Sequence, residues 1–184
     1  LWAMERGKHV YVEKPLTLNH ADSLRLVELV QKAGRSLTVG YTYLYDPPAV
    51  AVREIIASGA LGEPVHVESF FGYDLAGSFG SALLGAPGHW VHRLPGKLFH
   101  NHIDHMLNKA LEFIEDEAPA VAAFASTRRA HRFGDVRDAM ADELRVLLRG
   151  RKTTAYGTFS SHARPAAHFL RVYGTRRTVH ADFV

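Results

Sequence analysis

The chain has 184 residues, no cysteine and a formal net charge of +3, a size that allows one domain or two small ones. Without cysteine there are no disulfides and no thiolate chemistry, a composition that fits cytoplasm and periplasm alike. No apolar run is long enough to cross a membrane, and the basic residues are scattered rather than gathered into a nucleic-acid footprint. We therefore expect a cytoplasmic protein with neither membrane nor nucleic acid as a partner.

The first 45 residues predict a strand, a helix and a second strand. Residues 9–12 and 36–40 are short apolar runs, and residues 24–33 carry apolar side chains at helical spacing between a cap at Asn19 or Asp22 and Gly34. Such a unit implies a right-handed crossover and a parallel pair of strands. Because two strands cannot form an independent sheet of this type, we expect residues 1–45 to be the end of a doubly wound domain. We also expect the chain to be truncated at both ends.

Residues 46–184 predict an α+β domain. Asp46-Pro47-Pro48 starts a helix, residues 65–71 alternate like a strand with one solvated or interfacial face, and the glycine-rich residues 72–96 predict a long functional loop before a helix over about 98–114. Strands are predicted over 121–127, 143–148, 153–160, 168–173 and 178–183. The short connectors at 149–152 and 174–177 predict antiparallel pairing. The predicted fold class is α/β plus α+β, a remnant of a parallel sheet followed by a large, mostly antiparallel open sheet.

Lys14 follows the first strand, within Glu13-Lys14-Pro15. Chain leaving a parallel strand at its carboxyl end lines the ligand crevice of an α/β sheet, and the proline favours an extended backbone at the lysine. A fixed ammonium there could polarise a carbonyl or hydroxyl oxygen, as hydride transfer at that carbon requires. The alternative interpretation is a surface turn whose lysine has no function.

The stretch His100-Asn101-His102-Ile103-Asp104-His105 allows two interpretations. As His-x-His-x-Asp-His it resembles the zinc-binding signature of metallo-β-lactamase-fold hydrolases. On a helix, however, His100 and Asp104 share one face while His102 and His105 share another, so four convergent ligands are awkward. The helical interpretation pairs Asn101 with His105, or His100 with Asp104, to orient an imidazole as a general base. Surface or capping roles are the alternative.

Four segments, in this order, resemble the Gfo/Idh/MocA oxidoreductases, the glucose-fructose oxidoreductase and inositol dehydrogenase family. They are Gly7 to Leu16 with Leu18-Asn19, Val39-Gly40 with Tyr45-Asp46-Pro47, Ser58 to Glu63, and Val172 to Thr175. The resemblance implies a remnant of an NAD- or NADP-binding Rossmann domain over 1–45 and an α+β substrate and oligomerisation domain over 46–184. It further implies hydride transfer at a hydroxyl carbon of a sugar, cyclitol or similar polyol, and a homo-oligomer formed through the C-terminal sheet.

The resemblance also implies roles for individual residues. In such proteins the lysine of Glu-Lys-Pro lies at the nicotinamide and substrate, so Glu13, Lys14 and Pro15 are expected at the cofactor, with Lys14 also catalytic. The family's second motif, laid on residues 96–108, puts the catalytic histidine at His105 and asparagines, Asn101 and Asn108, where aspartates are usual. Asn101 and Trp90 are the expected substrate-binding residues, and no metal is expected.

The chain contains no Gly-x-Gly-x-x-Gly turn, the element that cradles the pyrophosphate of a dinucleotide. The resemblance therefore predicts that this chain alone binds NAD poorly or not at all. Two other functions stay open from the sequence. One is a zinc-dependent hydrolase using His100, His102, Asp104 and His105, and the other is a non-catalytic assembly or binding module.

Overall fold

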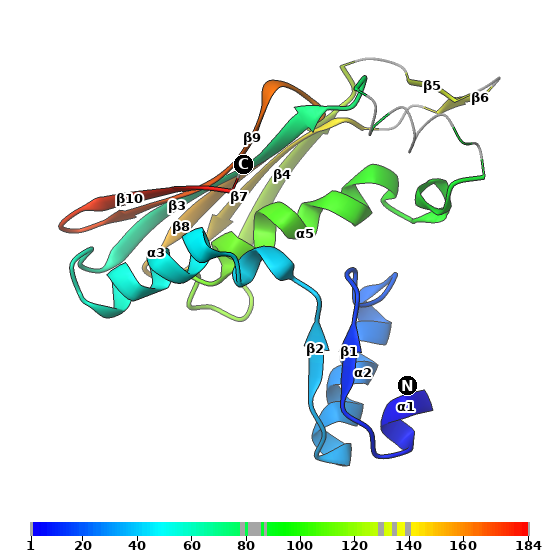
Figure 1. Ribbon diagram of the computed structural model, residues 1–184, viewed down its shortest axis with the longest axis horizontal. Helices are drawn as coiled ribbons and strands as arrows, with labels where there is room; N and C mark the ends of the chain where they lie inside the picture. The colour runs from blue at the N-terminus through cyan, green and yellow to red at the C-terminus, as the bar shows by residue number, and fades with distance from the viewer. Residues whose placement is uncertain are drawn as a thin grey trace. The chain divides into compact units, whose positions relative to one another are not determined.

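The computed structural model describes residues 2–77, 80, 86, 88–128, 131–133, 136–138 and 141–183. The chain divides into two compact units, Leu1–Thr42 and Tyr43–Val184, each with its own sheet (Figure 1). Within the described residues, no helix has the length and apolar character needed to cross a bilayer.

The first unit is the predicted strand–helix–strand unit. Its elements are α1 (Trp2–Glu5), β1 (Val10–Val12), α2 (His20–Ala33) and β2 (Leu37–Val39). The two strands pair in parallel, with Tyr11 beside Thr38. α2 begins after Asn19, whose side-chain oxygen accepts a hydrogen bond from the Asp22 amide at 2.9 Å, and it ends at Gly34 in the left-handed region with φ 58°. Both ends are thus set by residues that suit a helix cap.

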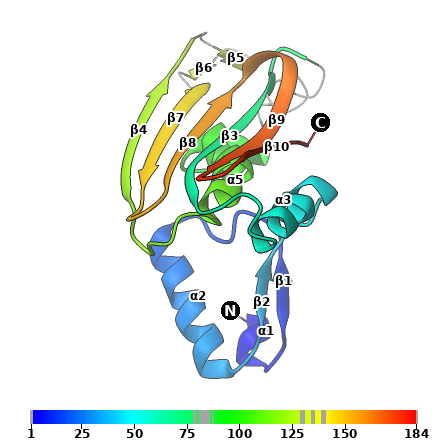
Figure 2. The same cartoon turned by 90° about the vertical axis from the view of Figure 1, so that its left-hand side faces the viewer.

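The second unit is built on a six-stranded sheet with helices on one face (Figures 1 and 2). After the short turn η1 (Thr42–Leu44), its elements are α3 (Pro47–Ala57), β3 (Pro64–Asp74), η2 (Trp90–Arg93), α5 (Lys97–Leu111), β4 (Ala120–Ser126), β5 (His131–Phe133), β6 (Val136–Asp138), β7 (Glu143–Arg149), β8 (Thr154–Ser160), β9 (His162–Gly174) and β10 (Thr178–Asp182).

The strand order in this sheet is β10-β9-β3-β8-β7-β4. β3 and β8 run parallel at the centre, and the other neighbours are antiparallel. The two predicted antiparallel hairpins are present, β7 with β8 and β9 with β10. The predicted α/β plus α+β fold class is confirmed.

Two strand boundaries and one hairpin differ from the sequence prediction. β9 begins at His162 rather than 168, because its first residues pair with the end of β3 across a register shift, with Asp74 opposite His162. β3 itself reaches Asp74, so the long loop predicted over 72–96 begins later and contains η2; residues 78, 79, 81–85 and 87 of that loop lie outside the described residues. The β5–β6 hairpin was not predicted, since strands of three residues carry too little periodicity.

The core lies between α5 and the sheet. Leu98, Met106 and Ala110 of α5 are buried in one cluster with Val67 and Phe159 of the central strands. Each large apolar side chain buried in this way contributes roughly 1.5–3 kcal/mol relative to exposure. A Cβ atom at Gly157 of β8 would lie 3.0 Å from the Met106 sulfur, so the glycine makes room for the helix on the central strand.

Candidate active site

Glu13, Lys14 and Pro15 leave the carboxyl end of β1. Glu13 is exposed, Lys14 and Pro15 are half-buried, and the Lys14–Pro15 peptide bond is cis. Gly40 follows β2 at the same edge, where its amide donates a hydrogen bond to the carbonyl of Val12 at 2.8 Å. The chain that leaves both parallel strands therefore gathers at one edge, the place where α/β sheets bind ligands.

Gly40 lies against two side chains at this edge. A Cβ atom there would lie 2.8 Å from the Tyr11 hydroxyl oxygen and 3.3 Å from both carboxylate oxygens of Glu13. Tyr11 and Glu13 are two residues apart along the chain, and residues at that spacing in a strand point to the same face. A Cβ atom at position 40 would make the ends of these two side chains shift.

In the second unit, His105 lies on α5 among aromatic rings. The Tyr43 ring meets it edge-on with centroids 5.0 Å apart, and the Phe71 ring of β3 is 5.2 Å away. The imidazole is half-buried. Contacts of this kind from two sides restrict the orientation of a ring, so His105 is presented in a defined direction.

Behind His105 lies a buried pair of nitrogen bases. The Lys109 ammonium is 2.7 Å from Nε2 of His168 on β9, and it also donates a hydrogen bond to the carbonyl of His105. The two side chains are only 1% and 2% exposed. Burial lowers the pKa of Lys109 to about 7, and burial together with the nearby Lys109 charge lowers the pKa of His168 to about 3. The shared proton therefore belongs to the lysine.

His102 occupies a second buried position on α5, about two turns before Lys109. Its Nδ1 lies 2.9 Å from the carbonyl of Leu98 and its Nε2 lies 3.1 Å from the Tyr73 hydroxyl. A carbonyl only accepts, so Nδ1 carries the proton and Nε2 accepts from the tyrosine. Burial raises the pKa of Tyr73, which keeps that hydroxyl a donor. This imidazole is thus held by a carbonyl and a hydroxyl within the protein.

Of the other expected residues, Asn101 is half-buried on α5 with its amide nitrogen 3.4 Å from Nε2 of His102. Trp90 opens η2, which precedes α5, and is 45% exposed with its ring 5.3 Å from that of His89. The amide nitrogen and oxygen of Asn108 are buried, and neither has a hydrogen-bond partner. A buried amide without a hydrogen-bond partner usually indicates that a water molecule or a ligand binds beside it.

Sequence reasoning missed Lys109, His168 and Tyr43. A signal was present for the lysine, because it lies in the run of inward positions that includes Met106 and Ala110, where an apolar side chain is expected. His168 and Tyr43 carried no such signal, since each becomes relevant only through packing against α5.

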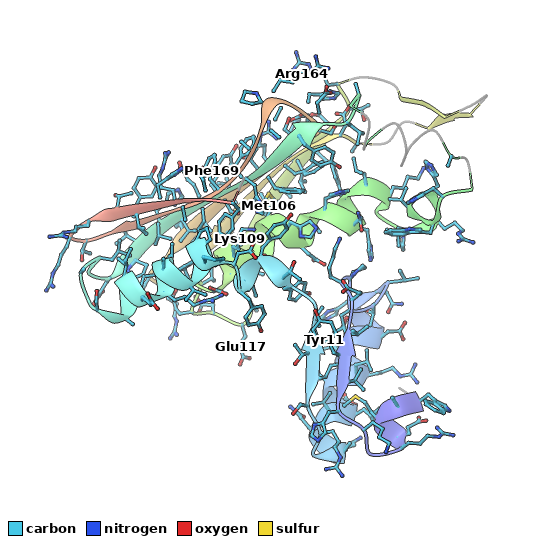
Figure 3. All side chains as sticks on the ribbon, viewed as in Figure 1. Tyr11, Met106, Lys109, Glu117, Arg164 and Phe169 are labelled. Carbon is cyan, nitrogen blue, oxygen red and sulfur yellow. The ribbon has the colours of Figure 1, made fainter. Side chains whose placement is uncertain are left out.

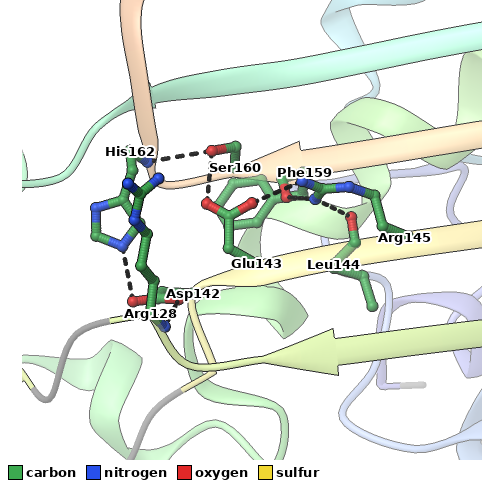
Figure 4. Close-up of polar contacts among 8 residues, drawn as sticks. All are labelled: Arg128, Asp142, Glu143, Leu144, Arg145, Phe159, Ser160 and His162. Atoms are coloured by element: carbon green, nitrogen blue, oxygen red, sulfur yellow. Dashed lines mark hydrogen bonds and ion pairs between the residues drawn. The ribbon is translucent and has the colours of Figure 1, made fainter.

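Among the described residues, one group of side chains away from α5 places candidate metal-ligand atoms close together. The group consists of Asp142, Glu143 and His162, whose candidate ligand atoms lie within 4.8 Å of one another (Figure 4). Glu143 is already held on both oxygens, by the Ser160 hydroxyl at 2.6 Å and by the Arg145 guanidinium at 2.9 Å. A guanidinium at that carboxylate takes the place that a cation would need.

A hollow of about 700 Å³ lies past the C-terminal end of α5 and includes the ion pair of Arg53 with Glu112 at 2.6 Å. His105 and Lys109 do not line it. We place the candidate active site by the chemistry of its side chains rather than by the size of this hollow.

Comparison with known proteins assigns both parts of the chain. Residues 49–180 match the family described as the GFO/IDH/MocA C-terminal domain, and residues 1–41 match the oxidoreductase family with an NAD-binding Rossmann fold. The chain belongs to the Gfo/Idh/MocA oxidoreductase family. This confirms the resemblance inferred from the four sequence segments.

Relatives of this Gfo/Idh/MocA chain include a myo-inositol 2-dehydrogenase of Thermotoga maritima, which is 28% identical over 96% of the chain and 50% of that protein. An NAD binding oxidoreductase from Klebsiella pneumoniae has a similar structure, with a TM-score of 0.83, 25% identity and coverage of 98% and 49% of the two chains. An aldose-aldose oxidoreductase from Caulobacter crescentus, complexed with glycerol, matches with a TM-score of 0.75, 28% identity and coverage of 98% and 51%. The Gfo/Idh/MocA chain spans about half the length of these relatives.

Proposed function

We propose that the whole protein is an NAD- or NADP-dependent oxidoreductase that transfers a hydride between nicotinamide and a hydroxyl carbon of a sugar, cyclitol or similar polyol. The carrying observation is that both halves of the chain match, in order, the two domains of one oxidoreductase family. The T. maritima relative is named for myo-inositol and the C. crescentus relative for aldoses, which supports a polyhydroxylated substrate. Residues 1–45 would contribute to the Rossmann domain and residues 46–184 would form the substrate and oligomerisation domain.

The edge after β1 and β2 fits the nicotinamide end of such a cofactor. Glu13, Lys14 and Pro15 leave the carboxyl end of β1, where α/β sheets bind ligands. These three residues would hold the cofactor there. When bound, the dinucleotide supplies the hydride acceptor or donor. The pyrophosphate-binding glycine turn is not among the residues of this chain.

Lys14 and His105 would share the proton chemistry. The Lys14 ammonium would polarise the substrate oxygen, and a ring nitrogen of His105 would take the hydroxyl proton as the hydride leaves the same carbon. The Tyr43 and Phe71 rings, 5.0 and 5.2 Å from the His105 ring, support this role because they orient it. Asn101 and Trp90 would bind the substrate.

We also infer that the protein is a homo-oligomer formed through the open face of the six-stranded sheet. α3 and α5 lie on one face (Figure 2). The other face carries Phe124 and Leu147, which are 69% and 54% exposed, and a stacked pair of Phe70 and Phe169 with ring centroids 5.4 Å apart. Apolar surface of this kind is typical of a subunit interface. A cytoplasmic location accompanies the proposal, since soluble nicotinamide dinucleotides belong to the cell interior.

The test is a turnover assay of the whole protein with NAD or NADP and a panel of cyclitols, aldoses and simple polyols, following reduced nicotinamide. We expect substrate-dependent reduction with at least one polyol. A protein that binds a polyol without turning it over would instead be a binding module. Stoichiometric zinc in the purified protein that is lost on replacement of His102 would support the zinc-dependent hydrolase and contradict the proposal.

A further inference from the structure

One end of the six-stranded sheet, where β3 ends and β9 begins, carries a polar hollow. It has a volume of about 250 Å³ and is lined by Asp74, Arg128, His162 and Arg164. All four side chains are ionisable, and with His162 neutral their net formal charge is +1. The proposed hydride transfer uses none of them.

A buried carboxylate builds this hollow. Asp142 is 0% exposed, and its two oxygens hold two of the lining residues in place (Figure 4). Oδ1 accepts a hydrogen bond from the backbone amide of Arg128 at 2.8 Å, and Oδ2 accepts one from Nε2 of His162 at 2.8 Å. The carboxylate therefore fixes the backbone of Arg128 and the ring of His162 at the hollow, while the Arg128 and Arg164 side chains are exposed to solvent and to a ligand.

The acidic groups around the hollow each have a partner. Asp142 accepts a hydrogen bond from His162, Glu143 is paired with Arg145, and Asp74 forms an ion pair with Arg164. The Arg128 guanidinium takes part in none of these three contacts between described residues. Arg164 has five N–H donors and Asp74 can occupy only some of them. The lining side chains therefore carry one excess positive charge, on the Arg128 guanidinium, and Arg164 keeps further N–H donors for a ligand.

The two arginines reach the hollow from different strands. Arg128 follows β4, and its side chain runs past the His162 ring (Figure 4), while Arg164 is near the start of β9 (Figure 3). Both line the same 250 Å³, so donors from two directions surround one volume. Planar guanidinium forks suit an anion with several acceptor oxygens, whereas a single carboxylate offers only two.

We propose that this hollow is a binding site for a phosphoryl group, with Arg128 and Arg164 as its hydrogen-bond donors. Free inorganic phosphate and a phosphate monoester share this chemistry. This proposal does not rest on the proposed oxidoreductase activity, so a test can contradict one of the two proposals and leave the other standing. Binding of a divalent cation is disfavoured here, because the Arg145 guanidinium occupies the Glu143 carboxylate and two further arginines line the hollow.

The experiment is calorimetric titration of this chain with sodium phosphate at constant ionic strength. We expect saturable binding with a dissociation constant of about 1 mM or tighter. Arg128→Gln and Arg164→Gln should each weaken binding about tenfold or more, the usual cost of losing a hydrogen bond to a charged group. Both side chains are exposed, and circular dichroism melts check that the variants stay folded.

Arg177→Gln is the matched control, because Arg177 is exposed in the β9–β10 turn, at the other end of β9. It removes the same charge and should leave the affinity unchanged. A second titration compares glucose 6-phosphate with glucose. Tighter binding of the ester than of phosphate identifies a monoester ligand, and equal binding identifies free phosphate. Absence of saturable phosphate binding, or equal weakening by all three variants, would overturn the proposal.

Discussion

The Lys109 ammonium nitrogen lies 2.7 Å from Nε2 of His168, with both side chains inside the second unit. The rings of Tyr43 and Phe183 each lie 5.2 Å from the same ammonium, and the His105 carbonyl accepts a hydrogen bond from it. α5 and β9 are therefore joined by one buried proton directly behind His105 (Figure 3 labels Lys109). A buried base whose pKa differs between the folded and the unfolded chain makes stability sensitive to pH.

The free energy of unfolding should rise between pH 7 and pH 9. The pKa of Lys109 is lowered to about 7 in the folded chain from an ordinary 10.5, so in this range the unfolded chain binds a proton that the folded chain has lost. The stabilisation that comes from this lowered pKa is complete above the pKa of the unfolded chain, and it is lost as pH falls through about 7. The slope is up to ~1.4 kcal/mol per pH unit. Urea unfolding at several pH values measures it, and Lys109→Met should flatten it; equal slopes for the two proteins would contradict the assignment.

Replacement of Lys109 should depend on the shape of the new side chain. Lys109→Met keeps the volume and removes the buried charge, so it should change stability by less than about 1 kcal/mol or raise it. Lys109→Ala leaves a cavity beneath Tyr43 and Phe183 and should cost about 2–4 kcal/mol. Chemical denaturation at pH 7 compares the two. A loss of the same size in both variants would mean that the ammonium itself is stabilising.

Gly174 should not tolerate alanine. A Cβ atom there would lie 2.2 Å from the carbonyl oxygen of Leu61 and 2.5 Å from its Cγ, so the end of β9 and the turn after α3 would have to separate. We expect Gly174→Ala to cost about 2–4 kcal/mol. Gly88→Ala is the control, since no atom of the described residues lies within 4 Å of a Cβ at Gly88, and its melting temperature should match the wild type. A harmless Gly174→Ala would show that these segments separate easily.

Lys14→Ala and His105→Ala should each lower kcat/KM of the whole protein about 10²-fold or more, because both groups act on the reacting oxygen in the proposed reaction. Steady-state kinetics with the best polyol measures the effect. Lys8→Ala, which removes an exposed lysine shortly before β1, is the control and should keep full activity. Unchanged turnover in either site variant would remove that residue from the mechanism.

This chain alone should not bind NADH tightly. It carries the β1–β2 edge but no Gly-x-Gly-x-x-Gly turn for the pyrophosphate. Fluorescence titration should show no saturation at concentrations where the whole protein is saturated. Tight, saturable binding by the chain would mean that its own residues supply a different pyrophosphate site.

Local sequence was sufficient for the elements of the first unit and for most of the second. Asn19 and Gly34 bound α2 because capping depends on one or two side chains and one backbone conformation. The strands flanking the 149–152 and 174–177 connectors pair antiparallel because a short turn leaves no other choice. The β5–β6 hairpin and the first residues of β9 lacked a periodic signal and were missed.

The sequence by itself determined the family, the βαβ unit, and Lys14 and His105 as candidates, because these depend on residues close together in the chain. Only the tertiary structure decided the parallel pairing of β3 with β8, the pair of Lys109 with His168, and the hollow between Arg128 and Arg164. Periodicity tells which face of a strand or helix is buried, but not which distant segment covers it. Lys109 and His168 are 59 residues apart, and their chemistry arises only where α5 meets β9.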